Sequence, residues 1–130
     1  MPPRLHCGLP SPSPDSIATG ITVRIDDHTA YEPDALVYCG ARLPRGSMIV
    51  SAPVVIVEVL SPATAHTDTS AKLIGYFKLP SVMHYLVLDP EARSVTHHVR
   101  DRVPEILTTG PLRLDPPRFD VTAEDLLGPP

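Results

Sequence analysis

Tryptophan is absent from this 130-residue chain, cysteine occurs only twice, and aromatic residues make up 5% of the sequence. With so few rings and no Trp, the chain lacks the aromatic platform on which proteins stack unpaired bases. Cys7 and Cys39 have neither a paired C-x-x-C spacing nor the density of a disulfide-rich secreted domain. We therefore expect two free thiols and no structural zinc site.

Long apolar runs are missing as well, because none approaches the roughly 20 residues that a membrane-spanning helix needs. The N-terminus also lacks the charged-then-apolar order of a secretory signal peptide. We therefore expect a cytoplasmic protein that does not contact a membrane. The formal charge of −4 argues against a protein that coats nucleic acid electrostatically, but it is compatible with a nuclease whose metal site adds carboxylates.

Proline is abundant, with 17 residues in the chain and five of them in the first 14. Each proline fixes its φ angle and removes a backbone donor, so this N-terminal piece cannot be a helix. We predict an extended, Pro-rich arm over residues 1–16 and one domain over residues 17–130, a length that supports a single core.

The most informative stretch begins with Val54-Val55-Ile56-Val57, a β-branched run typical of a strand that is buried on both faces. A helix is predicted to follow, capped by Asp68 and ended before Pro80. The next strand is predicted over residues 84–89. The order strand, helix, strand favours a crossover in which the two strands are parallel. The apolar face of the helix is expected to consist of Ala71, Leu73, Ile74 and Phe77.

Shorter elements are predicted on both sides of this unit. Residues 21–25 alternate as a strand, and residues 35–39 are expected to form a hairpin-like pair with them after a turn at 26–29. Residues 40–52 are predicted to be a loop whose Arg42 and Arg45 could contact phosphates. Further along, the pattern predicts a return strand over 94–99 and a short helix over 122–127. The fold class is α/β (α+β), with a mixed, mostly antiparallel sheet.

Glu58 is the residue that most needs a partner, since a carboxylate in a buried strand costs several kcal/mol, roughly, unless a charge or hydrogen bond meets it. If the strands of Asp34 and Glu58 are antiparallel neighbours, both carboxylates fall at the same end of the sheet. The helix leaves from that end and carries Lys72 in its first turns. Two carboxylates beside an ammonium suit Mg²⁺ or Mn²⁺ and a water nucleophile.

Several of these residues resemble a known family. The dipeptide Pro33-Asp34, the run from Val57 to Thr64 (VEVLSPAT), the downstream Asp68, Lys72 and Tyr76, and the strand 84–89 are similar to the Uma-type endonucleases of the PD-(D/E)xK restriction-endonuclease-like superfamily. The resemblance spans roughly Tyr31 to Arg100. It implies a restriction-endonuclease-like fold and Mg²⁺-dependent hydrolysis of nucleic acid, DNA being the expected substrate. By the same resemblance, Asp34 and Glu58 would be metal ligands and Lys72 the catalytic lysine.

The sequence departs from that pattern in two ways. The superfamily's lysine normally lies two residues after the acid, where this chain has Leu60, so Lys72 would have to act from the helix instead. Members of the family also usually carry a longer segment before the first strand. These departures motivate an alternative: a catalytically impaired, truncated homologue that acts as a dimeric binding or interaction module. An exposed sheet face leads us to expect a homodimer.

Each candidate residue also has a purely structural interpretation. Asp34 could be a turn residue after proline, and Glu58 could form a structural ion pair with Lys72 or an arginine. Lys72 alone would be a solvated helix residue. Tyr76 could pack in the core or hydrogen-bond near the site.

The histidines offer weaker signals. His97 and His98 are neighbours in a strand and so point to opposite faces, which prevents them from sharing one metal ion; we expect them to be surface residues. His66, close to the predicted site, is the histidine with functional potential.

Overall fold

The central sheet is built around the strand that contains Glu58, and the computed structural model orders its six strands β1-β4-β6-β7-β8-β9. Every neighbouring pair is antiparallel except β6 and β7, which are parallel. The helix α1 (Thr69–Phe77) connects these two strands, which confirms the predicted strand–helix–strand unit. The strands are β1 (Ile17–Ala18), β4 (Ala35–Tyr38), β6 (Pro53–Val59), β7 (His84–Asp89), β8 (Ser94–Val99) and β9 (Glu105–Leu107).

The structure describes residues 17–38, 46, 48–50, 52–61, 69–115 and 119–129. The predicted arm over residues 1–16 therefore lies outside the described residues, and so do five residues discussed above, Cys39, Arg42, Arg45, His66 and Asp68. Within the described part of the chain, no helix is both long and apolar enough to cross a membrane.

Two smaller sheets complete the fold. One has the order β3-β2-β5, with β2 (Thr22–Asp26), β3 (Thr29–Tyr31) and β5 (Ile49–Val50). The other pairs β10 (Pro111–Leu114) with β11 (Phe119–Thr122) and leads directly into α2 (Ala123–Leu127). Thr122 caps α2 by accepting from the backbone N–H of Asp125, as the predicted short helix over 122–127 requires.

The predicted hairpin between residues 21–25 and 35–39 is wrong. β2 pairs instead with β3, which begins at Thr29, so the turn contains only Asp27 and His28. Asp26 tightens this turn by accepting a 2.8 Å hydrogen bond from the backbone N–H of His28. β4 lies in the central sheet between β1 and β6, and the predicted loop over 40–52 contains β5. Strands this short offer too few alternating positions to be recognised.

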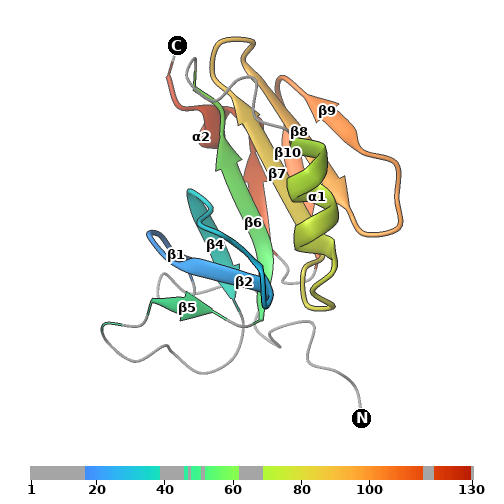
Figure 1. Ribbon diagram of the computed structural model, residues 1–130. Helices are drawn as coiled ribbons and strands as arrows, with labels where there is room; N and C mark the ends of the chain where they lie inside the picture. The colour runs from blue at the N-terminus through green and yellow to red at the C-terminus, as the bar shows by residue number, and fades with distance from the viewer. Residues whose placement is uncertain are drawn as a thin grey trace.

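Two apolar clusters cover the two faces of the central sheet. On one face α1 and the β3-β2-β5 sheet pack against strands β4, β6 and β7; in Figure 1, α1 lies over the side of β7 and β8, and β2 crosses the side of β4 and β6. On the other face, β10 and α2 pack against β6, β7 and β8. Burial on both faces explains the unbroken Val54–Ile56 run, in which each residue is at most 2% exposed.

The buried side of α1 is centred on Tyr76, which is fully buried. Its ring centroid lies 5.0 Å from that of Tyr31 and 5.3 Å from that of Tyr85, so the helix joins β3 to β7. Leu73 and Phe77 pack against this cluster as predicted.

Two predicted face residues do not pack there, because Ile74 is 65% exposed and Ala71 is also exposed. Gly75 lies on the buried side of α1 instead. A Cβ atom at this position would lie 2.8 Å from the Tyr31 ring, so close contact with Tyr31 requires glycine in the helix.

Arg100, which follows β8, holds the C-terminal end of α1. Its guanidinium donates to the carbonyl oxygens of Phe77 (2.9 Å), Leu79 (2.7 Å) and Val82 (2.9 Å). It also lies over the Phe77 ring at 5.0 Å. Carbonyls at a helix end lack partners within the helix, so one cation satisfies them and ties α1 to the sheet.

We predict that Arg100→Ala lowers the free energy of unfolding by roughly 2–3 kcal/mol, because three partly buried carbonyls lose a charged donor. Arg100→Lys should also lose most of this stability, because one ammonium cannot reproduce the forked donors of a guanidinium. The exposed neighbour Arg102 provides the control, and Arg102→Ala should change stability by less than about 0.5 kcal/mol. Urea denaturation measures all three, and equal effects at both positions would contradict the role of Arg100.

Candidate functional site

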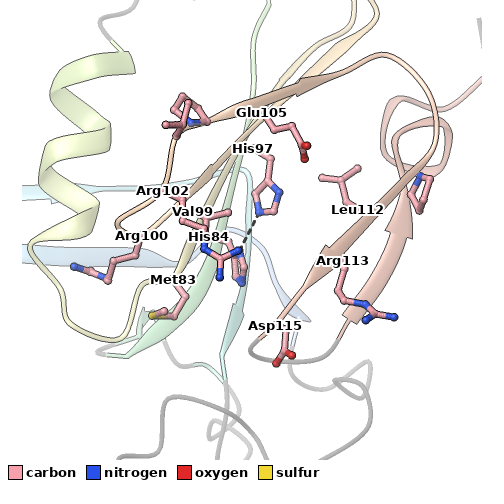
Figure 2. Close-up of a pocket in the computed structure, with 13 residues that line it drawn as sticks. Met83, His84, His97, Val99, Arg100, Arg102, Glu105, Leu112, Arg113 and Asp115 are labelled. Atoms are coloured by element: carbon pink, nitrogen blue, oxygen red, sulfur yellow. Dashed lines mark hydrogen bonds between the residues drawn. The ribbon is translucent and has the colours of Figure 1, made fainter.

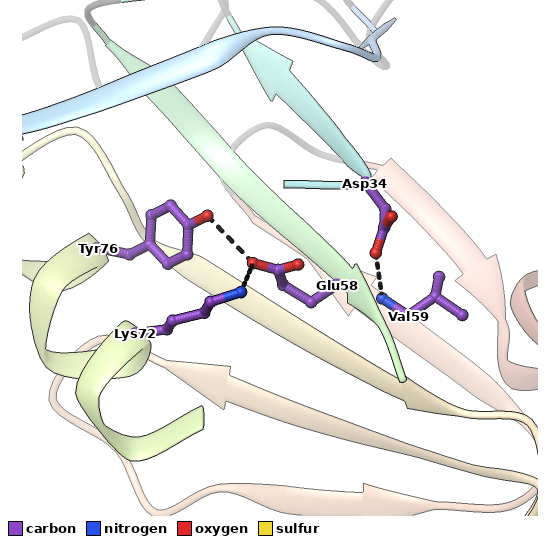
Figure 3. A network of polar contacts seen from close by, with 5 residues as sticks. All are labelled: Asp34, Glu58, Val59, Lys72 and Tyr76. Carbon is purple, nitrogen blue, oxygen red and sulfur yellow. Dashed lines mark hydrogen bonds and ion pairs between the residues drawn. The ribbon is translucent and has the colours of Figure 1, made fainter. Parts of the chain in front are cut away.

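Asp34 lies just before β4 and is held against the end of β6. β4 and β6 pair with Ala35 opposite Val57, so extending the register by one residue places Asp34 opposite Glu58. The Oδ2 atom of Asp34 accepts a 2.7 Å hydrogen bond from the backbone N–H of Val59 (Figure 3). The two strand ends therefore meet as the sequence predicts, with both acids at one end of the sheet.

Glu58 is 8% exposed, and its two side-chain partners among the described residues come from α1. Lys72 Nζ lies 3.3 Å from Glu58 Oε2, and the Tyr76 hydroxyl donates to the same oxygen at 3.1 Å. Figure 3 shows these two side chains on one side of Glu58 and Asp34 on the other. The predicted convergence of Asp34, Glu58 and Lys72 is thus present in the structure. Tyr76 packs in the core and also binds Glu58, so both of its proposed roles coexist.

A cleft of about 460 Å³ opens at this point of the sheet. Because Asp34, Glu58 and Lys72 all line it, the three predicted residues face a common space. Two further ionisable residues in this cleft, Glu32 and Tyr85, were not predicted. Its lining consists of Glu32, Asp34, Glu58, Val59, Leu60, Ser61, Thr69, Lys72 and Tyr85.

The two tyrosines beside Glu58 are held neutral. Burial and the nearby Glu58 carboxylate raise the pKa of Tyr76, and the same two causes raise the pKa of Tyr85. Both phenols therefore keep their protons at neutral pH. They can donate hydrogen bonds to negative oxygens in the cleft but cannot act as bases.

Each carboxylate of the site has one oxygen engaged and one that accepts no hydrogen bond from the described residues. The engaged atoms are Asp34 Oδ2 and Glu58 Oε2, which leaves Asp34 Oδ1 and Glu58 Oε1. Among the described residues there is no group of three or more His, Cys, Asp or Glu side chains that could hold a metal. Two carboxylate oxygens nevertheless fit Mg²⁺, which usually keeps several waters and binds through one or two carboxylates plus substrate phosphate.

A larger cleft of about 680 Å³ lies on the opposite face of the sheet (Figure 2). His84 Nδ1 and His97 Nε2 are 2.9 Å apart at this cleft, and both side chains are buried. His98 points the other way and stacks on Tyr85 at 5.8 Å. His97 and His98 do occupy opposite faces, as predicted, but the expectation that they are surface residues is wrong for His97, which is 5% exposed.

Comparison with known proteins finds a matching family model and similar solved structures. A family model, Uma2, described as "Putative restriction endonuclease", matches residues 10–122 of this chain. Among solved structures, the chain is similar to one titled "a putative nuclease belonging to DUF820" from Anabaena variabilis, with a TM-score of 0.67 and 21% sequence identity. The similarity covers 85% of this chain and 66% of that protein, so this chain spans just under two thirds of its length. No functionally curated protein matches.

The two histidines of β8, His97 and His98, predict a dependence of stability on pH. Burial lowers the pKa of His97 below its ordinary 6.5, with His98 acting in the same direction and Glu105 opposing it. Burial likewise lowers the pKa of His98. The unfolded chain then binds more protons than the folded one below about pH 6.5, so stability is complete above that value and falls as the pH decreases. Each proton taken up contributes at most about 1.4 kcal/mol per pH unit.

We expect urea denaturation between about pH 7.5 and 5.5 to show this loss, and His97→Gln to reduce its slope. The slopes are compared because the substitution also removes the contact with His84 at every pH. The exposed His28 supplies the control, and His28→Gln should leave the slope unchanged. A His97→Gln slope equal to that of the unmodified chain would refute the assignment.

Proposed function

This chain belongs to the Uma2 family, and from that premise we propose that it hydrolyses nucleic-acid phosphodiester bonds, DNA being the expected substrate, with a divalent metal ion held by Asp34 and Glu58. The observation that carries the proposal is the pair of carboxylates in one cleft, each with one oxygen fixed by the protein and one left to bind metal. Fixing one oxygen orients the other, which favours a hard cation such as Mg²⁺ or Mn²⁺.

The bound ion would lower the pKa of a coordinated water and offset charge on the phosphate. The chain's own residues prepare the site for this. The Tyr76 hydroxyl and the Lys72 ammonium donate to one oxygen of Glu58, and the Val59 N–H fixes the rotamer of Asp34. Among the described residues Lys72 uses one N–H donor, toward Glu58, which leaves two, and the side chain is partly exposed, so it can contact a negative oxygen of the substrate.

Lys72 would take over the role that the superfamily gives to a lysine two residues after the acid, where this chain has Leu60. Leu60 lines the cleft but also packs against the apolar cluster beneath α1. A cation delivered from the helix therefore reaches the same carboxylate that a strand lysine would have reached.

A second candidate is a catalytically impaired binding module in dimeric form, in which the ion pair between Lys72 and Glu58 would be purely structural. At 3.3 Å, with Glu58 largely buried, this pair also has the form of a structural contact that holds α1 on the sheet. The two candidates differ in what the charge on Glu58 does for stability.

We predict that Asp34→Asn, Glu58→Gln and Lys72→Gln each reduce Mg²⁺-dependent cleavage of plasmid DNA by about a hundredfold or more. Asn and Gln keep an acceptor for Val59 and Tyr76 while removing the negative charge. Calorimetry should show weaker Mg²⁺ or Mn²⁺ binding for the two acid variants and binding close to wild type for Lys72→Gln. Glu105→Gln, in the larger cleft on the opposite face, is the matched control and should cut normally. Absence of both metal binding and cleavage in the unmodified chain would sink the proposal.

Stability separates the enzyme from the binding module. If the Glu58 charge serves catalysis at a cost to stability, Glu58→Gln should raise the free energy of unfolding, by roughly 1 kcal/mol. A structural ion pair predicts the reverse, since Lys72 would lose its partner. Urea denaturation at neutral pH measures the sign of the change in the free energy of unfolding. Sedimentation of the same variants tests the predicted dimer. A less stable Glu58→Gln that keeps full cleavage would favour the structural interpretation.

A further inference from the structure

The hydroxyl of Tyr85 has no hydrogen-bond partner among the described residues, although the residue is fully buried. Burying a polar group without a partner is costly, so such groups in native proteins call for a reason. The neighbouring Tyr76 is equally buried, and its hydroxyl is satisfied by Glu58. The two rings lie 5.3 Å apart, so similar surroundings produce one paired and one unpaired phenol.

The unpaired hydroxyl belongs to a residue that lines the cleft of Asp34 and Glu58. β7 pairs with β6 so that Val87 is opposite Glu58, and Tyr85 lies two residues earlier on the same face. Asp34 approaches Glu58 from β4, on the opposite side of β6. The cleft therefore has three acidic residues, Glu32, Asp34 and Glu58, toward β4 and β6, and hydrogen-bond donors toward α1 and β7.

The donor side suits an anionic oxygen. The Tyr85 hydroxyl has a proton to donate, and the Lys72 ammonium supplies positive charge over the same cleft. A hydrogen bond from such a donor to a charged oxygen is among the stronger ones in proteins. A phosphoryl oxygen has this character, and a phosphodiester places it beside the group that a metal on the acidic side would contact.

We propose that the Tyr85 hydroxyl and the Lys72 ammonium form a subsite for a phosphoryl oxygen of the nucleic-acid backbone. The proposal rests on the proposed function and deepens it, because it assigns the substrate's phosphate to the β7 side of the cleft and the metal to the β4 side. Tyr85 would then be a substrate-binding residue whose hydroxyl is kept unpaired in the free protein.

Tyr85→Phe tests the idea with two readouts that move in opposite directions. Removing an unsatisfied hydroxyl should raise the melting temperature by roughly 2 °C or more, whereas Tyr76→Phe, which removes a satisfied one, should lower it. Tyr85→Phe should also weaken binding of a short fluorescent DNA duplex by about tenfold or more, measured by anisotropy at fixed salt with Ca²⁺ in place of Mg²⁺.

Titration of inorganic phosphate into the same variants distinguishes a phosphoryl oxygen of the nucleic-acid backbone from free phosphate as the ligand. Duplex binding equal to that of the unmodified chain would overturn the proposal, whether or not phosphate binding changes. A lower melting temperature for Tyr85→Phe would also overturn it, since the hydroxyl would then have a structural partner. If Asp34→Asn and Glu58→Gln abolish metal binding and cleavage while Tyr85→Phe binds duplex normally, the subsite fails and the proposed function stands.

Discussion

The buried carboxylate of Glu58 is the constraint on which the rest of the site depends. At 8% exposure it needs a cation or a donor, and its two side-chain partners among the described residues come from α1. The helix must therefore cross this face at the height of Glu58, with Lys72 and Tyr76, one turn apart, turned toward the sheet. Arg100 fixes the other end of α1 by satisfying its last carbonyls, so the helix cannot shift without losing contacts at both ends.

Three tyrosines connect α1 to the layers on either side of it. Tyr76 contacts Tyr31 of β3 on one side and Tyr85 of β7 on the other, so a single ring column joins the small sheet, the helix and the central sheet. The column is close-packed, because Gly75 leaves no room for a Cβ against Tyr31. Lys72 also lies 5.8 Å from the Tyr31 ring, which adds an apolar and cation–π support to the ammonium.

The parts of this arrangement that could be predicted are those with a dense local signal. Three elements could be recognised as helix or strand from the sequence: the β-branched run of β6, the helix before Pro80 and the apolar strand β7. Their order along the chain predicts that β6 and β7 are parallel. Asp34 and Glu58 followed from the ends of two strands. Strands of two to four residues, such as β3 and β5, were not predicted, because so few positions do not show which strand is the pairing partner. Tyr85 was missed because only the β6–β7 register places its side chain beside Glu58.

Alternation along β7 and β8 then divides the chemistry between the two faces of the sheet. His84 and His97 point into the larger cleft, where a ring nitrogen of one contacts a ring nitrogen of the other. Tyr85 and His98 stack on the face of α1. Size alone would select the larger cleft as the site. The smaller one, however, contains what the larger one lacks among the described side chains: carboxylate oxygens already oriented by a second contact and a buried hydroxyl with no partner. Because a buried polar atom without a partner is costly in a free protein, the unsatisfied Tyr85 hydroxyl in this cleft is stronger evidence for a ligand than the volume of either cleft.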